Sequence, residues 1–128
     1  MKKSYRVKRE KDFQNVFHQG NSVANRQLVM YVIEKPQQTH FRVGFSVGKK
    51  IGNAVCRNRI KRYLRAAIHE LRDYLPENVD FILIARPDSI HKNYHEIKQS
   101  IVHVMKLAKI IHHESNNKYM EELNEKTR

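Results

Sequence analysis

The architecture of the chain depends on residues 42–71, which read RVGFSVGKKIGNAVCRNRIKRYLRAAIHEL. Residues 40–47, which lead into this stretch, alternate apolar and polar side chains and predict a strand that pairs back on the strand before it. Residues 48–52 form a basic loop that begins and ends with glycine. Asn53 has the side chain of a helix N-cap, and the apolar spacing after it predicts a long helix that runs to about Tyr74.

This predicted helix has two different faces. At about 100° per residue, five apolar side chains gather within one quadrant, where they are expected to pack on a sheet. They are Ile60, Leu64, Ala67, Ile68 and Leu71. Four polar side chains point away from that quadrant, and they are Asn58, Lys61, Arg62 and Arg65. We expect Arg59 on the flank of the helix and Arg57 nearer the apolar side, at the start of the helix.

Positive charge is concentrated in the first part of the chain. The net charge is +12, and residues 1–72 hold 17 of the 25 Lys and Arg but 4 of the 13 Asp and Glu. The stretch from Arg42 to Arg65 contains eight basic residues and no acid. A solvated charged face is the common alternative, but such faces usually mix both signs. Nucleic acid is therefore the favoured partner, ahead of an anionic membrane surface, which would need exposed large apolar side chains as well.

The rest of the chain predicts a small α+β domain. Residues 1–8 are expected to be a flexible basic arm, 9–19 a helix, 21–35 one or two strands, 79–85 a buried strand and 93–113 a final helix. Helix, strands, helix, strand and helix in this order predict a two-layer sandwich. We expect a single domain over residues 1–114 and a polar, acidic tail over residues 115–128.

Several of these segments carry a resemblance to a known family. Residues 42–62 resemble the signature of the bacterial ribonuclease P protein family, in which Arg-Asn-Arg opens a helix and is followed by Lys-Arg and a further Arg. These residues are Arg57, Asn58, Arg59, Lys61, Arg62 and Arg65 here. Asp12-Phe13 with Phe17, and the segment at residues 85–87, also match. The resemblance covers about residues 5–113.

The resemblance implies a fold and a function. The implied fold is a mixed sheet of about four strands with three helices and a left-handed βαβ crossover (ribosomal protein S5 domain 2-like). The implied function is that of a ribonuclease P subunit, which binds the catalytic RNA and the 5′ leader of precursor tRNA and assists removal of that leader. Phosphodiester hydrolysis would come from the RNA subunit and its Mg²⁺ ions, so no catalytic residue and no bound cofactor is expected in this chain.

The resemblance also implies two sets of contact residues. The contacts to the catalytic RNA would be Lys49, Lys50, Arg57, Asn58, Arg59, Lys61, Arg62 and Arg65. The contacts to the tRNA leader would be Phe13, Phe17, Val29 and Tyr31, in an apolar cleft where single-stranded bases stack on rings. Core packing is the competing interpretation for Phe13, Val16 and Ile33.

Other functions are less well supported by the residue types. His91 and His95 have the spacing of two ligands on one helix face, but the further ligands of a zinc site are not suitably placed, so no metal site is expected. The single cysteine, Cys56, and the lack of an apolar stretch near 20 residues favour a cytoplasmic protein. Two alternatives to the ribonuclease P subunit remain: a structural RNA-binding protein such as a ribosomal component, and a stand-alone endonuclease.

Overall fold

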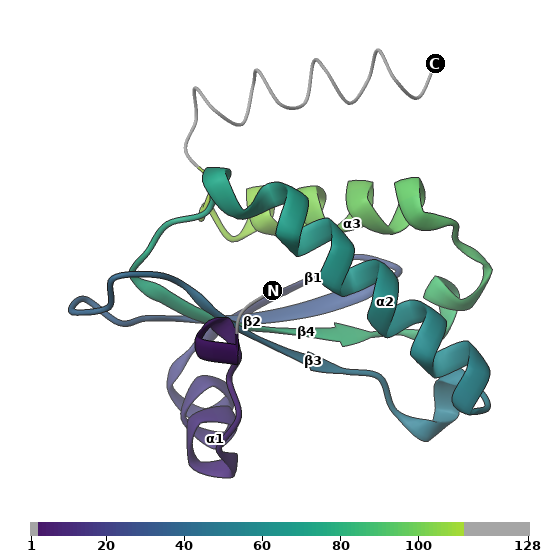
Figure 1. Ribbon diagram of the computed structural model, residues 1–128, viewed down its shortest axis with the longest axis horizontal. Helices are drawn as coiled ribbons and strands as arrows, with labels where there is room; N and C mark the ends of the chain where they lie inside the picture. The colour runs from purple at the N-terminus through teal and green to yellow at the C-terminus, as the bar shows by residue number, and fades with distance from the viewer. Residues whose placement is uncertain (1–2, 112–128) are drawn as a thin grey trace.

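The computed structural model describes residues 3–111, in which three α-helices surround a four-stranded sheet (Figure 1). The α-helices are α1 (Glu10–Gln19), α2 (Ala54–Leu71) and α3 (Tyr94–Leu107). The strands are β1 (Asn21–Ala24), β2 (Leu28–Glu34), β3 (Arg42–Ser46) and β4 (Val79–Ala85). Four short 3-10 helices are η1 (Lys3–Tyr5), η2 (Lys49–Ile51), η3 (Arg72–Tyr74) and η4 (Pro87–His91). The predicted domain end at residue 114 and the tail at 115–128 lie outside the described residues.

The sheet is mixed, and its strand order is β1-β2-β4-β3. The β1–β2 and β2–β4 pairs are antiparallel, whereas β3 runs parallel to β4. The α+β class and the four-stranded mixed sheet are therefore confirmed. The parallel β3–β4 pair is joined through α2, and the left hand of this crossover remains what the resemblance implies.

The predicted pairing of the strand at residues 40–47 with the strand before it is wrong. In the structure β4 lies between β2 and β3, so β3 pairs with β4 instead. The physical reason is the composition of β4, Val79–Ala85, in which every residue except Ile84 is buried. Apart from Asp80, β4 is apolar on both faces; such a strand gains most from a central position, and this gain outweighs the local preference for a hairpin.

The two faces of the sheet carry different helices. In Figure 1, α2 and α3 lie together on one side of the sheet, and α1 lies on the other. The main core fills the space under α2 and α3, where alternate residues of β2 and β4 meet the apolar faces of the two helices. The α1 side is less completely covered. On that side Val29, Tyr31 and Ile33 of β2 are only half-buried.

Helix α2 begins at the predicted cap, since the side chain of Asn53 accepts a hydrogen bond from the Cys56 amide (3.0 Å). Helix α3 ends at Leu107, earlier than expected, and residues 112 and 113 of its predicted span lie outside the described residues. Lys109 has a φ of 59°, and the amide of Ile110 donates back to the carbonyl of Met105 (3.1 Å). These two features define a Schellman motif at the end of α3. The sequence does not indicate it, because the left-handed position of this motif is usually glycine and here it is lysine.

The expected flexible arm at residues 1–8 is wrong for the described residues 3–8. The Val7 amide donates to the carbonyl of Val43 (2.9 Å), and Arg6 forms a β-bridge with the same residue. Val7 is buried, with 5% of its surface exposed. Because β3 is an edge strand with unpaired backbone groups, this segment covers part of an otherwise open edge.

Candidate nucleic-acid interface

The outer side of α2 carries the predicted polar arc, which we call the basic ridge (Asn58, Lys61, Arg62 and Arg65). Asn58, Arg62 and Arg65 are exposed, and Lys61 is half-buried. The five apolar residues predicted for the opposite side are all fully buried. Each of the four larger side chains among them contributes about 1.5–3 kcal/mol by its burial, so the helix is held firmly with the ridge facing solvent.

The charge of the ridge is not cancelled by the ion pairs of the described chain. Among residues 3–111, the ion pairs join carboxylates to Arg42, Lys92 and Lys98, and none of these pairs includes a ridge residue. The first acid along α2 is Glu70, which accepts hydrogen bonds from the Lys98 ammonium and the Tyr94 hydroxyl on α3 (both 2.5 Å). The only carboxylate of α2 therefore interacts with residues of α3.

Arg57 and Arg59, predicted as RNA contacts, are both half-buried at the start of α2. The Arg59 guanidinium donates to the carbonyl of Ile90 in η4 (2.6 Å), so it fastens α2 to the segment that follows β4. The Nε atoms of Arg57 and Arg59 are buried and find no hydrogen-bond partner within the described chain. Arg59 therefore has a structural contact that the sequence did not indicate.

The loop before α2 presents further positive charge. Lys49 and Lys50 lie in η2 and are exposed, while Ile51 beside them is buried and anchors the loop. Gly52 has a φ of 146°, a conformation that side chains with a Cβ rarely adopt, so glycine is required at this corner. The two lysines consequently extend the positive surface beyond the first turn of α2.

The face of the sheet that carries α1 contains the predicted aromatic residues. Phe17 of α1 and Tyr31 of β2 meet edge to face, with their ring centroids 5.0 Å apart, and Phe13 lies 6.4 Å from Phe17. All three rings are half-buried. Val29 lies on the same sheet face, two residues from Tyr31. The structure thus brings Phe13, Phe17 and Tyr31 together, with Val29 next along the strand.

Two further residues extend this surface, one apolar and one polar, and were missed by sequence analysis. Ile84 of β4 stands directly beside Val29, and Ser46 of β3 stands on the other side of Ile84. Both are half-buried, as Val29 is. Because β4 carries apolar residues on both faces, its sequence does not reveal which residues share a face with Tyr31, and the pairing register shows it instead. Val16 is fully buried, which confirms its interpretation as core.

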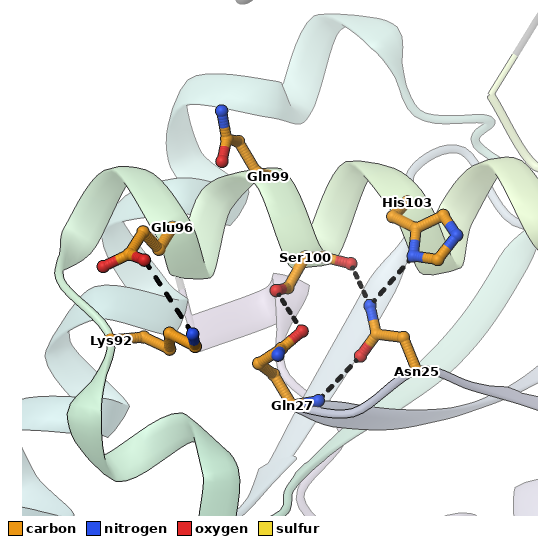
Figure 2. A pocket seen from close by; sticks show the side chains of 7 residues that line it. All are labelled: Asn25, Gln27, Lys92, Glu96, Gln99, Ser100 and His103. Atoms are coloured by element: carbon orange, nitrogen blue, oxygen red, sulfur yellow. Dashed lines mark hydrogen bonds and ion pairs between the residues drawn. The ribbon is translucent and has the colours of Figure 1, made fainter. Parts of the chain in front are cut away.

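A polar hollow between the β1–β2 turn and α3 is lined by side chains that hydrogen-bond to one another and to the backbone (Figure 2). The side chain of Asn25 donates to the Ser100 carbonyl (3.0 Å) and accepts from the Gln27 amide (3.0 Å). The hydroxyl of Ser100 donates to the side-chain oxygen of Gln27 (2.8 Å). These groups fasten the turn to α3, and we assign them a structural role.

The histidines do not form a metal centre in the part of the chain that the structure describes. His91 and His95 are both exposed, and residues 3–111 contain no group of three or more His, Cys, Asp or Glu placed to hold an ion. None of the described helices has the length and apolar character needed to cross a membrane. The described residues present two candidate surfaces, which are the basic ridge with its lysine loop and the aromatic face under α1.

Comparison with known proteins places the chain in a family. A sequence model of the family described as Ribonuclease P matches residues 1–109. The ribonuclease P protein component of Enterococcus faecalis is 58% identical over 111 residues, which are 87% of this chain and 94% of that protein. The component from Listeria welshimeri is 52% identical over 118 residues, which are 91% of this chain and 98% of that protein.

Solved structures agree with this assignment. The RNase P protein of Staphylococcus aureus superposes with a TM-score of 0.80 at 42% identity, covering 86% of this chain and all of that one. The RNase P protein of Thermotoga maritima shares the fold, with a TM-score of 0.72 at 23% identity over 79% of this chain and 94% of that one. With its basic ridge, its aromatic sheet face and these relatives, the chain belongs to the bacterial ribonuclease P protein family.

Proposed function

We propose that the protein is the RNA-binding subunit of ribonuclease P and assists the removal of 5′ leaders from precursor tRNA in the cytoplasm. The observation that carries the proposal is the basic ridge of α2, whose positive charge faces solvent and is not taken up by the ion pairs of the described chain. An isolated helix would be destabilised by such a row of like charges, whereas phosphates opposite the row reverse the sign of the effect.

The ridge and its surroundings would bind the catalytic RNA. Arginine presents a planar fork of donors that suits two phosphate oxygens at once, and lysine adds a mobile point charge. The proposed contacts are Lys49, Lys50, Arg57, Asn58, Arg59, Lys61, Arg62 and Arg65. Arg59 is the most constrained of them, because part of its guanidinium is already bound to the Ile90 carbonyl.

The aromatic face under α1 would hold the single-stranded leader. Rings at the surface offer sequence-tolerant stacking platforms, each worth about 1–3 kcal/mol per base. The proposed contacts are Phe13, Phe17, Val29 and Tyr31, and the register adds Ile84 and Ser46 as their neighbours. The half-burial of these side chains supports the proposal, because a fully buried ring has no face left for a base.

Hydrolysis itself is assigned to the RNA subunit and its Mg²⁺ ions. The protein would neutralise phosphates of both RNAs, which raises substrate affinity and reduces the amount of Mg²⁺ that the assembly needs. In the described chain the carboxylates of Asp12 and Asp80 are paired with Arg42, so they are not arranged as a two-metal site.

Reconstitution tests the proposal. The purified protein is added to a bacterial ribonuclease P RNA at low Mg²⁺ with precursor tRNA, and release of the leader is followed with time. We expect cleavage that requires the RNA and rises strongly with the protein. No enhancement at any Mg²⁺ concentration would contradict the proposal and favour a structural RNA-binding protein, whereas cleavage by the protein alone would indicate an endonuclease.

A further inference from the structure

We propose that Asp12, Arg42 and Gly44 form a latch that fixes α1 over the sheet, and that this latch positions the aromatic rings that bind the leader. The proposal rests on the proposed function of the aromatic face. It assigns to these residues a positioning role, since none of them is argued to contact the leader itself.

The fixed half of the latch is the pair formed by Arg42 and Asp80. These residues stand side by side in the register of the parallel strands β3 and β4. Arg42 donates through Nε to one carboxylate oxygen of Asp80 (3.0 Å) and through a terminal nitrogen to the other (2.5 Å). Asp80 is fully buried, and its hydrogen bonds raise the pKa of Arg42. The guanidinium is thus oriented by the sheet and does not depend on α1 for its position.

The other half of the latch reaches α1. The remaining terminal nitrogen of Arg42 lies 3.5 Å from a carboxylate oxygen of Asp12, with about a quarter of each side chain exposed. This ion pair joins α1 to the sheet, and Asp12 immediately precedes Phe13. The first turn of α1 is therefore held in place next to Phe13, one of the rings of the aromatic face.

Gly44 supplies the second point of attachment. The ring of Phe13 lies directly on this glycine, where an added Cβ would be 2.8 Å from two ring carbons. Arg42 and Gly44 are two residues apart on β3, so the ion pair and the ring contact hold successive residues of α1 on one strand. A side chain at position 44 would displace the ring of Phe13 from its place on the strand, and the contact that helps to hold α1 there would be lost.

The position of α1 matters because the helix has a small apolar anchor. Val16 is its one fully buried residue, while Phe13 and Phe17 are only half-buried. Phe17 lies one turn beyond Phe13 and meets the ring of Tyr31 edge to face, with the ring centroids 5.0 Å apart. A rotation of α1 about its first turn would change this distance, and with it the space open to a base.

The substitution Asp12→Asn tests the latch, because it keeps the size of the side chain and leaves the Arg42–Asp80 pair intact. Glu10→Gln is the matched control, since Glu10 is exposed in the first turn of the same helix and the change removes the same charge. In the holoenzyme we measure the affinity ratio between leader-bearing and mature tRNA. Asp12→Asn should lower this ratio about two- to fivefold relative to Glu10→Gln, the range that loss of one partly exposed ion pair allows.

Two further variants separate the possible failures. Phe17→Ala should also lower the ratio. If it does so while the Asp12→Asn and Glu10→Gln variants have the same ratio, the latch is refuted and the leader site stands. If Phe17→Ala leaves the ratio unchanged, the leader site and the latch both fail. Gly44→Ala, examined at a temperature where circular dichroism shows it folded, should lower the ratio while its affinity for the RNA subunit stays at the wild-type value.

Discussion

Removing Arg62 or Arg65 should weaken RNA binding mainly through the loss of phosphate contacts. Both side chains are exposed on α2 and take no part in the ion pairs of residues 3–111. Arg62 also lies over the ring of Tyr63 at 6.0 Å, a contact of modest strength at an exposed site. Arg62→Ala and Arg65→Ala are therefore expected to fold as the wild type does, so that changes in binding report the interface.

The expected size follows from counterion release. Each duplex phosphate contact contributes about 0.9 to the slope of log affinity against log salt concentration. Between about 50 and 200 mM salt, one lost contact changes the ratio of wild-type to variant affinity by about 3.5-fold, and the double variant changes it by about 12-fold. The difference from the wild type should be largest at the low-salt end.

The assay is a titration of ribonuclease P RNA with each protein at several salt concentrations. Lys106→Ala is the control, because Lys106 is an exposed basic residue on α3, away from the ridge, and its loss lowers the net charge equally. The ridge variants should show shallower slopes than the control. Equal slopes for ridge and control variants would mean that Arg62 and Arg65 do not touch phosphate, and the RNA interface would have to be sought elsewhere.

Three other substitutions have defined outcomes. Phe17→Ala should reduce the affinity for leader-bearing tRNA by about 1–3 kcal/mol and leave mature tRNA unaffected, and equal losses for both RNAs would return the ring to a packing role. Arg42→Ala should cost about 2–4 kcal/mol of unfolding free energy in urea, because it leaves the buried carboxylate of Asp80 unpaired. In the wild-type protein the hydrogen bonds to Asp80 raise the pKa of Arg42, so the guanidinium stays charged at neutral and mildly alkaline pH. The stability difference between wild type and Arg42→Ala should therefore be the same at both pH values. Asn53→Ala should cost about 1 kcal/mol by the same measurement, through loss of the cap on the Cys56 amide, and an unchanged stability would show that the cap is replaced by water.

Local features were predictable from the sequence because their causes are local. The cap at Asn53, the buried side of α2 and the span of β4 follow from side-chain chemistry and periodicity within one segment. The ridge was predictable for the same reason, since the helical period alone separates Arg62 and Arg65 from Leu64.

Features that depend on pairing between distant segments were not predictable in this way. The placement of β4 between β2 and β3 depends on competition among strands, and it determines that Ile84 lies beside Val29 on the sheet. The contact between Arg59 and the Ile90 carbonyl joins segments 31 residues apart. The latch at Arg42 likewise requires the register with Asp80, which no spacing in the sequence indicates.

Lysine reactivity in the assembled particle tests the role of the basic surface most directly. The protein is treated with an amine-modifying reagent, alone and bound to ribonuclease P RNA, and modification at each lysine is measured by mass spectrometry. Lys49, Lys50 and Lys61 should become protected when the RNA binds, while the exposed Lys106 and Lys109 should react as before. Uniform protection, or protection confined to Lys106 and Lys109, would contradict an RNA interface on α2.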